Sequence, residues 1–216
     1  MSQRRFASLV ALGAAATIAG NLAHVEWLVF LFKPATSAFI SIAAWREWNA
    51  CRDRYRLSIV VGLALSLAGD VFLMLPGNWF VHGLAAFLLA HIAYLSAFTS
   101  DHRLATRWQP FAAFALFAAC MLIVLWPGLA ASLRVPVLLY VVFLAAMTSQ
   151  SVSRHMTLRT VSSREAAIGG ILFLCSDALL AINKFHTPLP LASLWILGTY
   201  YAAQYRIAKS AIASPA

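Results

Sequence analysis

The sequence alternates long apolar runs with short polar segments along its whole length. A helix needs about 20 apolar residues to span the hydrocarbon core of a bilayer, and most of these runs approach that length. Backbone groups inside a bilayer need internal partners, and the ten-residue alternating segments of a membrane barrel are absent, so we expect helices. Eight helices are predicted, at about residues 6–22, 27–45, 57–75, 79–98, 109–126, 134–149, 165–182 and 188–206.

The basic residues are distributed unequally between the two ends of these predicted spans. With eight crossings, Arg134 and Lys184 lie on the side away from the N-terminus, and Lys33 lies inside the second run. Because cytoplasmic loops carry the excess of Lys and Arg, this bias predicts an even number of spans with both termini in the cytoplasm. The basic residues on the N-terminal side are Arg4, Arg5, Arg46, Arg52, Arg54, Arg56, Arg103, Arg107, Arg154, Arg159, Arg164, Arg206 and Lys209.

The composition indicates an integral membrane protein. Of the 216 residues, 62% are hydrophobic and only 11% are charged, and the mean hydropathy is +0.80. The net charge of +9 resides in short loops between apolar runs, so nucleic-acid binding is not expected. We therefore predict an all-α polytopic protein with one transmembrane helical domain over residues 1–216. The first apolar run is interpreted as its first helix, and Cys120 and Cys175 as small core residues.

Two aspartates within apolar runs are the main functional signal. Asp70 is the only charged residue in the run 57–75, and Asp177 lies at the centre of residues 171–182. A carboxylate at membrane depth costs roughly 2.5–3.5 kcal/mol on insertion scales and usually faces a bundle interior or a water-filled cavity. Since the chain has only seven acidic residues, we interpret this pair as functional.

Four polar side chains from different helices are predicted to lie at one level. Asp70, Asp177, Lys33 and Tyr140 are each five or six residues from the non-cytoplasmic end of a predicted span, which corresponds to a depth of about 8–9 Å. One enclosed polar pocket would require such an arrangement. Lys33, which precedes Pro34, is equally interpreted as a snorkelling lysine at a kink, and Tyr140 as a packing or interface residue.

The fourth run carries a helical stripe whose polar members are His91 and Tyr94. His91 is interpreted either as a hydrogen-bonded core histidine or as a catalytic residue. Counted from the end of its run, it lies about 9 Å deeper than the aspartates. A metal site built from His91 and the two aspartates is therefore not expected.

Two further residues are candidates for supporting roles. Lys184 lies seven residues after Asp177 on the same helix face, where it either attracts a phosphate at the pocket mouth or anchors the end of the helix. Tyr200 belongs, with Tyr201 and Gln204, to a group of which one member is expected to line the interior. No zinc-protease, nucleophile-elbow or phosphate-loop motif is present, and we expect neither a cofactor nor a metal ion.

At these residues the chain resembles the YhhN-like family of membrane proteins, whose eukaryotic members are lysoplasmalogenases. The resemblance covers about residues 27–206. It implies eight helices and hydrolysis of the vinyl ether bond of lysoplasmalogens to a fatty aldehyde and a glycerophospho-base, with Asp70 and Asp177 at the positions of the family's proposed catalytic aspartates. The matching segments are Lys33-Pro34, Gly69-Asp70-Val-Phe-Leu, Phe87-Leu-Leu-Ala-His91-x-x-Tyr94, Leu174-Cys-Ser-Asp177-Ala-Leu-Leu-Ala-Ile-Asn-Lys-Phe185 and Tyr200…Gln204.

The chemistry that the resemblance implies suits two carboxyl groups. Vinyl ether hydrolysis needs one acid to protonate the β-carbon and one carboxylate to stabilise the cation and activate water, as in glycosidases. Lys33 is expected to hold one aspartate ionised, and the order of roles stays open. The expected partners are a lysophospholipid substrate entering laterally and the lipids of a bacterial inner (plasma) membrane. A proton-coupled transporter or a lipid-binding protein is the alternative, because intramembrane acids also form ion relays.

Overall fold

The computed structural model describes residues 3–50 and 53–213, with backbone alone for residues 3 and 47–50. These described residues form eight α-helices and one short 3-10 turn, without strands, as the apolar runs predicted. The elements are α1 (Gln3–Leu22), α2 (Glu26–Ala50), α3 (Arg54–Met74), α4 (Phe80–Phe98), α5 (Gln109–Leu125), η1 (Trp126–Gly128), α6 (Ala131–Leu158), α7 (Val161–Phe185) and α8 (Ala192–Ile212).

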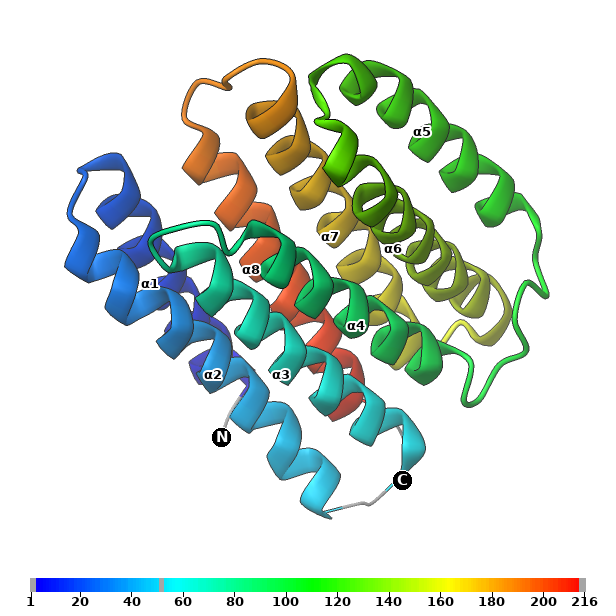
Figure 1. Cartoon of the computed structure of the whole chain (residues 1–216). Helices are drawn as coiled ribbons and strands as arrows, with labels where there is room; N and C mark the ends of the chain where they lie inside the picture. Colours follow the sequence, from blue (N-terminus) through cyan, green and yellow to red (C-terminus); the bar gives the residue numbers. More distant parts are fainter. Residues whose placement is uncertain (1–2, 51–52, 214–216) are drawn as a thin grey trace.

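The helices form one bundle in which α8 occupies a central position (Figure 1). Helices α1, α2, α3, α4, α6, α7 and α8 contact one another in a closed ring, and α8 also packs against α2 and α3. Helix α5 lies at the edge, where it packs mainly along α6. The start of α1 and the end of α8 lie toward the same end of the bundle in Figure 1.

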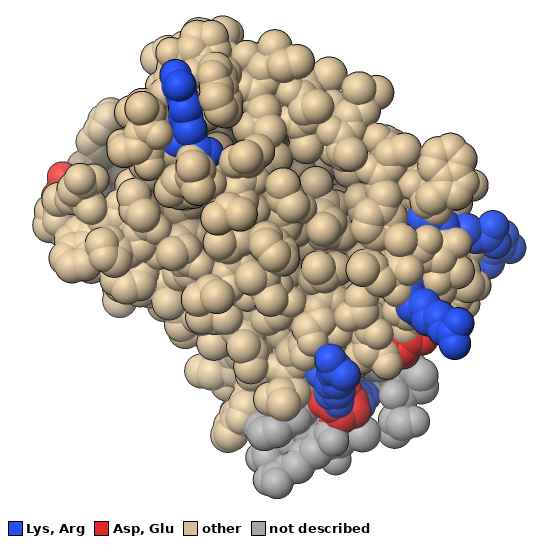
Figure 2. All heavy atoms as spheres, turned by 45° about the vertical axis from the view of Figure 1, so that its right-hand side comes forward, with Lys and Arg blue, Asp and Glu red and all other residues tan. Residues whose placement is uncertain are grey.

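Seven of the described helices, α1 to α7, are long and apolar enough to cross a membrane. Helix α8 has 21 residues but does not meet this criterion, because it carries Gln204, Arg206 and Lys209. It packs against α1, α2, α3 and α7, so protein rather than lipid surrounds much of its surface. Figure 2 shows the charged residues of one face gathered toward the ends of the molecule, with a broad uncharged belt between them.

Helices α6 and α7 are longer than their apolar runs predicted. The runs ended at 149 and began at 165, whereas α6 continues to Leu158 and α7 begins at Val161. Some of the intervening polar residues are buried and make tertiary contacts: Gln150 Nε2 donates to the Phe98 carbonyl at 3.0 Å, and Arg154 pairs with Asp101 at 2.7 Å. Thr160 then caps α7 by accepting a hydrogen bond from the Ser163 amide.

The expectation for the two cysteines was wrong. Cys120 and Cys175 are exposed on the surface of the bundle rather than buried in its core. Both lie on helix faces turned away from the bundle interior, in helices that are long and apolar enough to cross a membrane. An apolar run in a membrane span therefore does not indicate which of its faces is buried, since lipid and core favour the same residues.

Candidate active site

Both intramembrane aspartates line one cavity. Its volume is about 760 Å³, and Asp70 from α3 and Asp177 from α7 both belong to its wall. Residues 75–77 and Trp79 of the α3–α4 connection also line it, which places the cavity toward that end of the bundle. The predicted group at one level is thus brought together around a common space, since Lys33 and Tyr140 line the same cavity.

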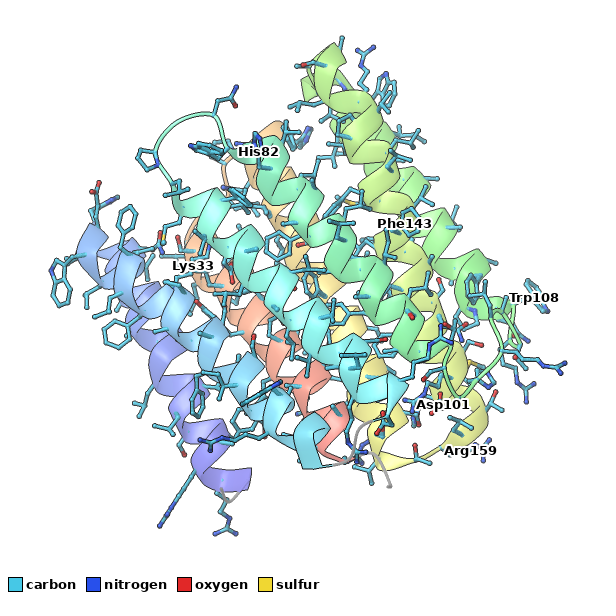
Figure 3. The ribbon with its side chains drawn as sticks, turned by 60° about the horizontal axis from the view of Figure 1, so that its bottom comes forward. Lys33, His82, Asp101, Trp108, Phe143 and Arg159 are labelled. Atoms are coloured by element: carbon cyan, nitrogen blue, oxygen red, sulfur yellow. The ribbon has the colours of Figure 1, made fainter. Side chains whose placement is uncertain are left out.

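Asp70 is bound by one cation and two hydroxyl groups. Lys33 on α2 places Nζ 3.4 Å from Asp70 Oδ1, while Ser37 and Tyr200 donate hydrogen bonds to Oδ2 at 2.7 and 2.6 Å. Only 2% of Asp70 is exposed. In Figure 3, Lys33 lies within the bundle, far from Asp101 at the other end. A buried carboxylate with a cationic partner and charge-assisted hydrogen bonds is compensated for the loss of water.

Ser37 was not predicted from the sequence, although a signal for it was present. It lies four residues after Lys33 on the same helix, and residues at this spacing share one face. Because Lys33 points toward Asp70, the hydroxyl of Ser37, one turn further along the same helix, is positioned to contact the same carboxylate.

A chain of hydrogen bonds continues from Asp70 into the interior. Gln204 Nε2 donates to the Tyr200 hydroxyl at 3.0 Å, and the Tyr94 hydroxyl donates to Gln204 Oε1 at 3.2 Å. The Ser66 and Tyr94 hydroxyls lie 3.1 Å apart. Tyr200 therefore touches Asp70 and lines the cavity, whereas Tyr94 is separated from Asp70 by two intervening side chains and supports the site from behind the wall.

Asp177 has different surroundings. The Tyr140 hydroxyl donates to Asp177 Oδ2 at 2.6 Å, and its side chain is 13% exposed, compared with 3% for Asp70. Within the described residues no Lys or Arg lies within ion-pair distance of Asp177. His91 Nε2 is the basic atom that approaches it, at 4.0 Å from Oδ2. One carboxyl group in the cavity is thus paired with a cation, and the other is not.

His91 is fully buried, yet neither of its ring nitrogens has a hydrogen-bond partner. Its ring lies against Tyr140 and Phe173, with centroids 5.0 and 4.9 Å apart. The prediction that His91 lies about 9 Å deeper than the aspartates was wrong for Asp177, which His91 Nε2 approaches. Asp177 is eight residues from the end of α7 at Phe185, and His91 is eleven from the start of α4 at Phe80. This small offset permits the contact.

Aromatic rings separate the surroundings of the two carboxyl groups. Phe173 packs against His91 on one side and against Tyr200 on the other, with centroids 4.9 and 5.7 Å apart. Gly69 explains how α3 approaches this wall: a Cβ atom there would lie 2.6 Å from the Phe87 ring. The glycine next to Asp70 therefore has a packing role, since any side chain would push the carboxylate's helix away from α4.

Lys184 lines the cavity near the end of α7. Its Nζ lies 4.5 Å from the centre of the Phe80 ring and 5.9 Å from that of Phe185. These are cation–π contacts, which leave the ammonium group able to bind an anion. No group of three or more His, Cys, Asp or Glu residues that could hold a metal ion occurs among the described residues.

Comparisons with known proteins agree on one family. The model of the YhhN family matches residues 28–211. Human "Lysoplasmalogenase TMEM86A" is 35% identical over 161 residues, which make up 72% of this chain and 65% of the human protein. "Lysoplasmalogenase" of Mycobacterium tuberculosis is 33% identical over 162 residues, which make up 71% of this chain and 60% of that protein.

A third relative matches over more of its length. "Uncharacterized membrane protein YhhN" of Escherichia coli is 26% identical over 188 residues, which make up 87% of this chain and 81% of that protein. The chain thus spans about 60–65% of the lysoplasmalogenases that it matches in human and M. tuberculosis. No solved structure matches the chain.

Proposed function

The chain belongs to the YhhN family, and from this premise we propose that it is a membrane-embedded hydrolase acting on the vinyl ether bond of lysoplasmalogens. The products would be a fatty aldehyde and a glycerophospho-base. Relatives named lysoplasmalogenase, at 33–35% identity, support this assignment. The cavity is of a size typical of sites for small ligands, and it combines an apolar wall with a few convergent polar groups.

One observation carries the proposal: two carboxyl groups share the cavity, and only Asp70 is paired with a cation. Lys33 forms an ion pair with Asp70, and Ser37 and Tyr200 each donate a hydrogen bond to its Oδ2, so three neighbours compensate the buried carboxylate. Asp177 receives one hydroxyl hydrogen bond and lacks a cationic partner among the described residues. On the basis of this difference we propose Asp177 as the general acid and Asp70 as the base.

The proposed reaction begins with Asp177 protonated and Asp70 ionised. Protonated Asp177 transfers its proton to the β-carbon of the vinyl ether, and the electron pair of the C=C bond forms the new C–H bond. The resulting oxocarbenium ion is stabilised by the Asp70 carboxylate, which accepts a proton from the attacking water. The hemiacetal collapses to the aldehyde and the free glycerol hydroxyl. Proton return from Asp70 to Asp177 through water restores the starting state.

Tyr140 and His91 would support Asp177 during this cycle. The Tyr140 hydroxyl already donates to Oδ2, so it stabilises the carboxylate left after the proton is transferred. His91 Nε2 lies 4.0 Å from the same oxygen and has no other partner. A small movement brings the two groups within hydrogen-bond distance, and the ring would then help to hold the developing negative charge.

In the membrane, we propose eight spans, including α8, with both termini in the cytoplasm of a bacterial inner membrane. The charge bias of the loops supports this orientation. Asp70 and Asp177 would then lie near the non-cytoplasmic surface, and a lysophospholipid could reach the cavity from that leaflet. Fusion of a reporter active only in the periplasm to the C-terminus tests the orientation, with no activity expected.

The buried Lys33–Asp70 pair also favours a second function, that of a small proton-coupled transporter, because such pairs occur in ion relays. A single assay separates the two. Purified protein is incubated in detergent with a 1-alkenyl lysophospholipid, and aldehyde release is measured against the matching 1-alkyl lipid, which lacks the vinyl ether. A hydrolase releases aldehyde from the alkenyl lipid alone, whereas a transporter or a lipid-binding protein releases none.

A further inference from the structure

The cavity extends from the aspartates into an apolar region between α4, α5 and α6. Its wall there is built from Leu84 on α4, Ala118 and Met121 on α5, and Val141 and Leu144 on α6. We call these five residues the apolar arm. The arm adjoins Asp177 through Tyr140, the residue before Val141, which hydrogen-bonds to that carboxyl group. Lys33 and Asp70 belong to other helices, α2 and α3.

The packing of α5 leaves room for this arm. Helix α5 packs along α6 and lies at the edge of the bundle (Figure 1), and it has no extensive contact with α4. Leu125 and Val137 form a small apolar cluster at this place, separate from the main core. Leu84, Met121 and Val141 border that cluster but remain only partly buried, as expected for side chains that face a cavity.

We propose that the apolar arm is the binding site for the single hydrocarbon chain of the substrate. This inference rests on the proposed function and fixes the orientation of the lipid. The chain lies between α4, α5 and α6, and the glycerophosphate lies toward Lys33 and Asp70. In a vinyl ether the β-carbon is the one attached to the chain, so this orientation brings the β-carbon to Asp177. The carbon that water attacks is attached to the ether oxygen and lies toward Asp70.

This orientation of the lipid agrees with the proposed roles of Asp177 as general acid and Asp70 as base. The carboxyl group without a cation is the one beside the apolar arm, and it is the proton donor to the chain-side carbon. The carboxylate paired with Lys33 lies on the side of the charged headgroup. The reverse orientation would place the phosphate among Leu84, Met121 and Leu144.

Ala118 provides a test of this site because its neighbour is a matched control. Ala118 is 8% exposed and lines the cavity, whereas Ala119 is exposed on the outer side of α5. A phenylalanine at 118 fills the arm and blocks a long chain, while a short chain still fits beside Asp177. A phenylalanine at 119 adds the same ring to the same helix but projects into lipid or detergent.

The first experiment compares A118F and A119F on 1-alkenyl lysophospholipids with long and short chains (about eighteen and about eight carbons). For A118F, kcat/KM for the long chain relative to the short one is expected to fall by about tenfold or more, the size of effect that pocket-filling changes produce. For A119F this ratio is expected to stay at the wild-type value. An unchanged ratio in A118F, or equal changes in both variants, would overturn the proposal.

The second experiment needs no turnover and uses the unaltered protein. A 1-alkyl lysophospholipid that carries a diazirine at the end of its chain is photolysed with the protein, and labelled residues are mapped by mass spectrometry. Labelling is expected on the cavity-facing residues of α5 or α6, with competition by unlabelled lysolipid. Labelling confined to α1, α2 or α8 would overturn the chain site. Specific labelling of α5 or α6 without aldehyde release would refute the proposed hydrolysis and leave the chain site intact.

Discussion

Lys33 places its ammonium nitrogen 3.4 Å from Oδ1 of Asp70, and both side chains are largely buried. Two hydroxyl groups donate to the other oxygen of the same carboxylate. Asp177, in the same cavity, has no such cation among the described residues. The two aspartates thus share a cavity but differ in charge environment, and acid–base catalysis by a carboxyl pair requires that difference.

Replacing Lys33 with methionine is expected to destabilise the protein strongly. The variant leaves the Asp70 carboxylate buried without its cation, and breaking a buried pair in this way costs about 3–5 kcal/mol of folding free energy. Unfolding in detergent, followed by circular dichroism, measures the loss. The double variant K33M/D70N removes both charges and is expected to recover most of the stability but no activity. A K33M protein as stable as the wild type would show that the pair contributes little.

Lys184 provides the control for this prediction. Its ammonium group contacts the rings of Phe80 and Phe185 rather than a carboxylate, and its side chain is exposed. Cation–π contacts at exposed sites contribute about 0.5–1 kcal/mol. K184M is therefore expected to unfold close to the wild-type midpoint. If K184M lost as much folding free energy as K33M, the effect of K33M could not be attributed to the ion pair with Asp70.

Tyr140→Phe removes the hydroxyl that donates to Asp177 and keeps the ring. A hydrogen bond to a charged group contributes about 1.5–3 kcal/mol, so kcat is expected to fall about 10- to 100-fold. Tyr205→Phe is the matched control, because the Tyr205 ring packs against Phe6 and its hydroxyl makes no hydrogen bond in the described part of the chain. Equal rates for both variants would exclude a contribution from the Tyr140 hydroxyl.

His91→Leu is expected to separate stability from activity. Both ring nitrogens of His91 are buried without partners, and an unsatisfied buried polar group costs about 1–3 kcal/mol. Leucine has a similar volume and no polar atom, so the free energy of unfolding is expected to rise. Turnover is expected to fall about tenfold, since Asp177 loses the basic group 4.0 Å away. A variant that is less stable, or fully active, would contradict this assignment.

The positions of the helices could be predicted from the sequence because lipid requires long apolar segments. The polar end of α6 could not, since Gln150 and Arg154 are buried only through contacts with residues about 50 positions away. Such pairing is not visible in the local pattern. The predicted helices left residues 150–164 as a loop because isolated polar residues favour solvent, whereas the folded chain supplies partners for Gln150 and Arg154.

The site was predictable to a similar extent. A charged residue within an apolar run is unusual by itself, and this identified Asp70 and Asp177. The hydrogen-bond partners of these carboxyl groups could not be predicted in the same way. Tyr200 lies 130 positions from Asp70, and no spacing rule relates the two residues. The depth of His91 was misjudged because α7 extends beyond its apolar run, so counting from the end of the run gave the wrong level.

Asp101→Asn tests whether stability and turnover can be separated at the other end of the bundle. Arg154 is 2% exposed and binds Asp101 through two hydrogen bonds, at 2.8 and 2.7 Å. Removal of the carboxylate leaves a buried guanidinium without its charge partner, and a loss of about 3 kcal/mol is expected. Turnover by the folded fraction should equal that of the wild type, because Asp101 lies far from Lys33, which lines the cavity (Figure 3). A lower kcat under conditions where all of the variant is folded would contradict the expectation that only stability changes.

Aldehyde release by D70N and D177N, each purified from membranes and verified as folded by its unfolding transition, tests the central claim most directly. Asparagine keeps the shape of the side chain but can neither give up a proton to the vinyl ether nor accept one from water. Both variants are predicted to insert, fold and bind the 1-alkyl lysophospholipid, with hydrolysis of the 1-alkenyl lipid reduced to the background rate. Hydrolysis near the wild-type rate by both variants would contradict the account.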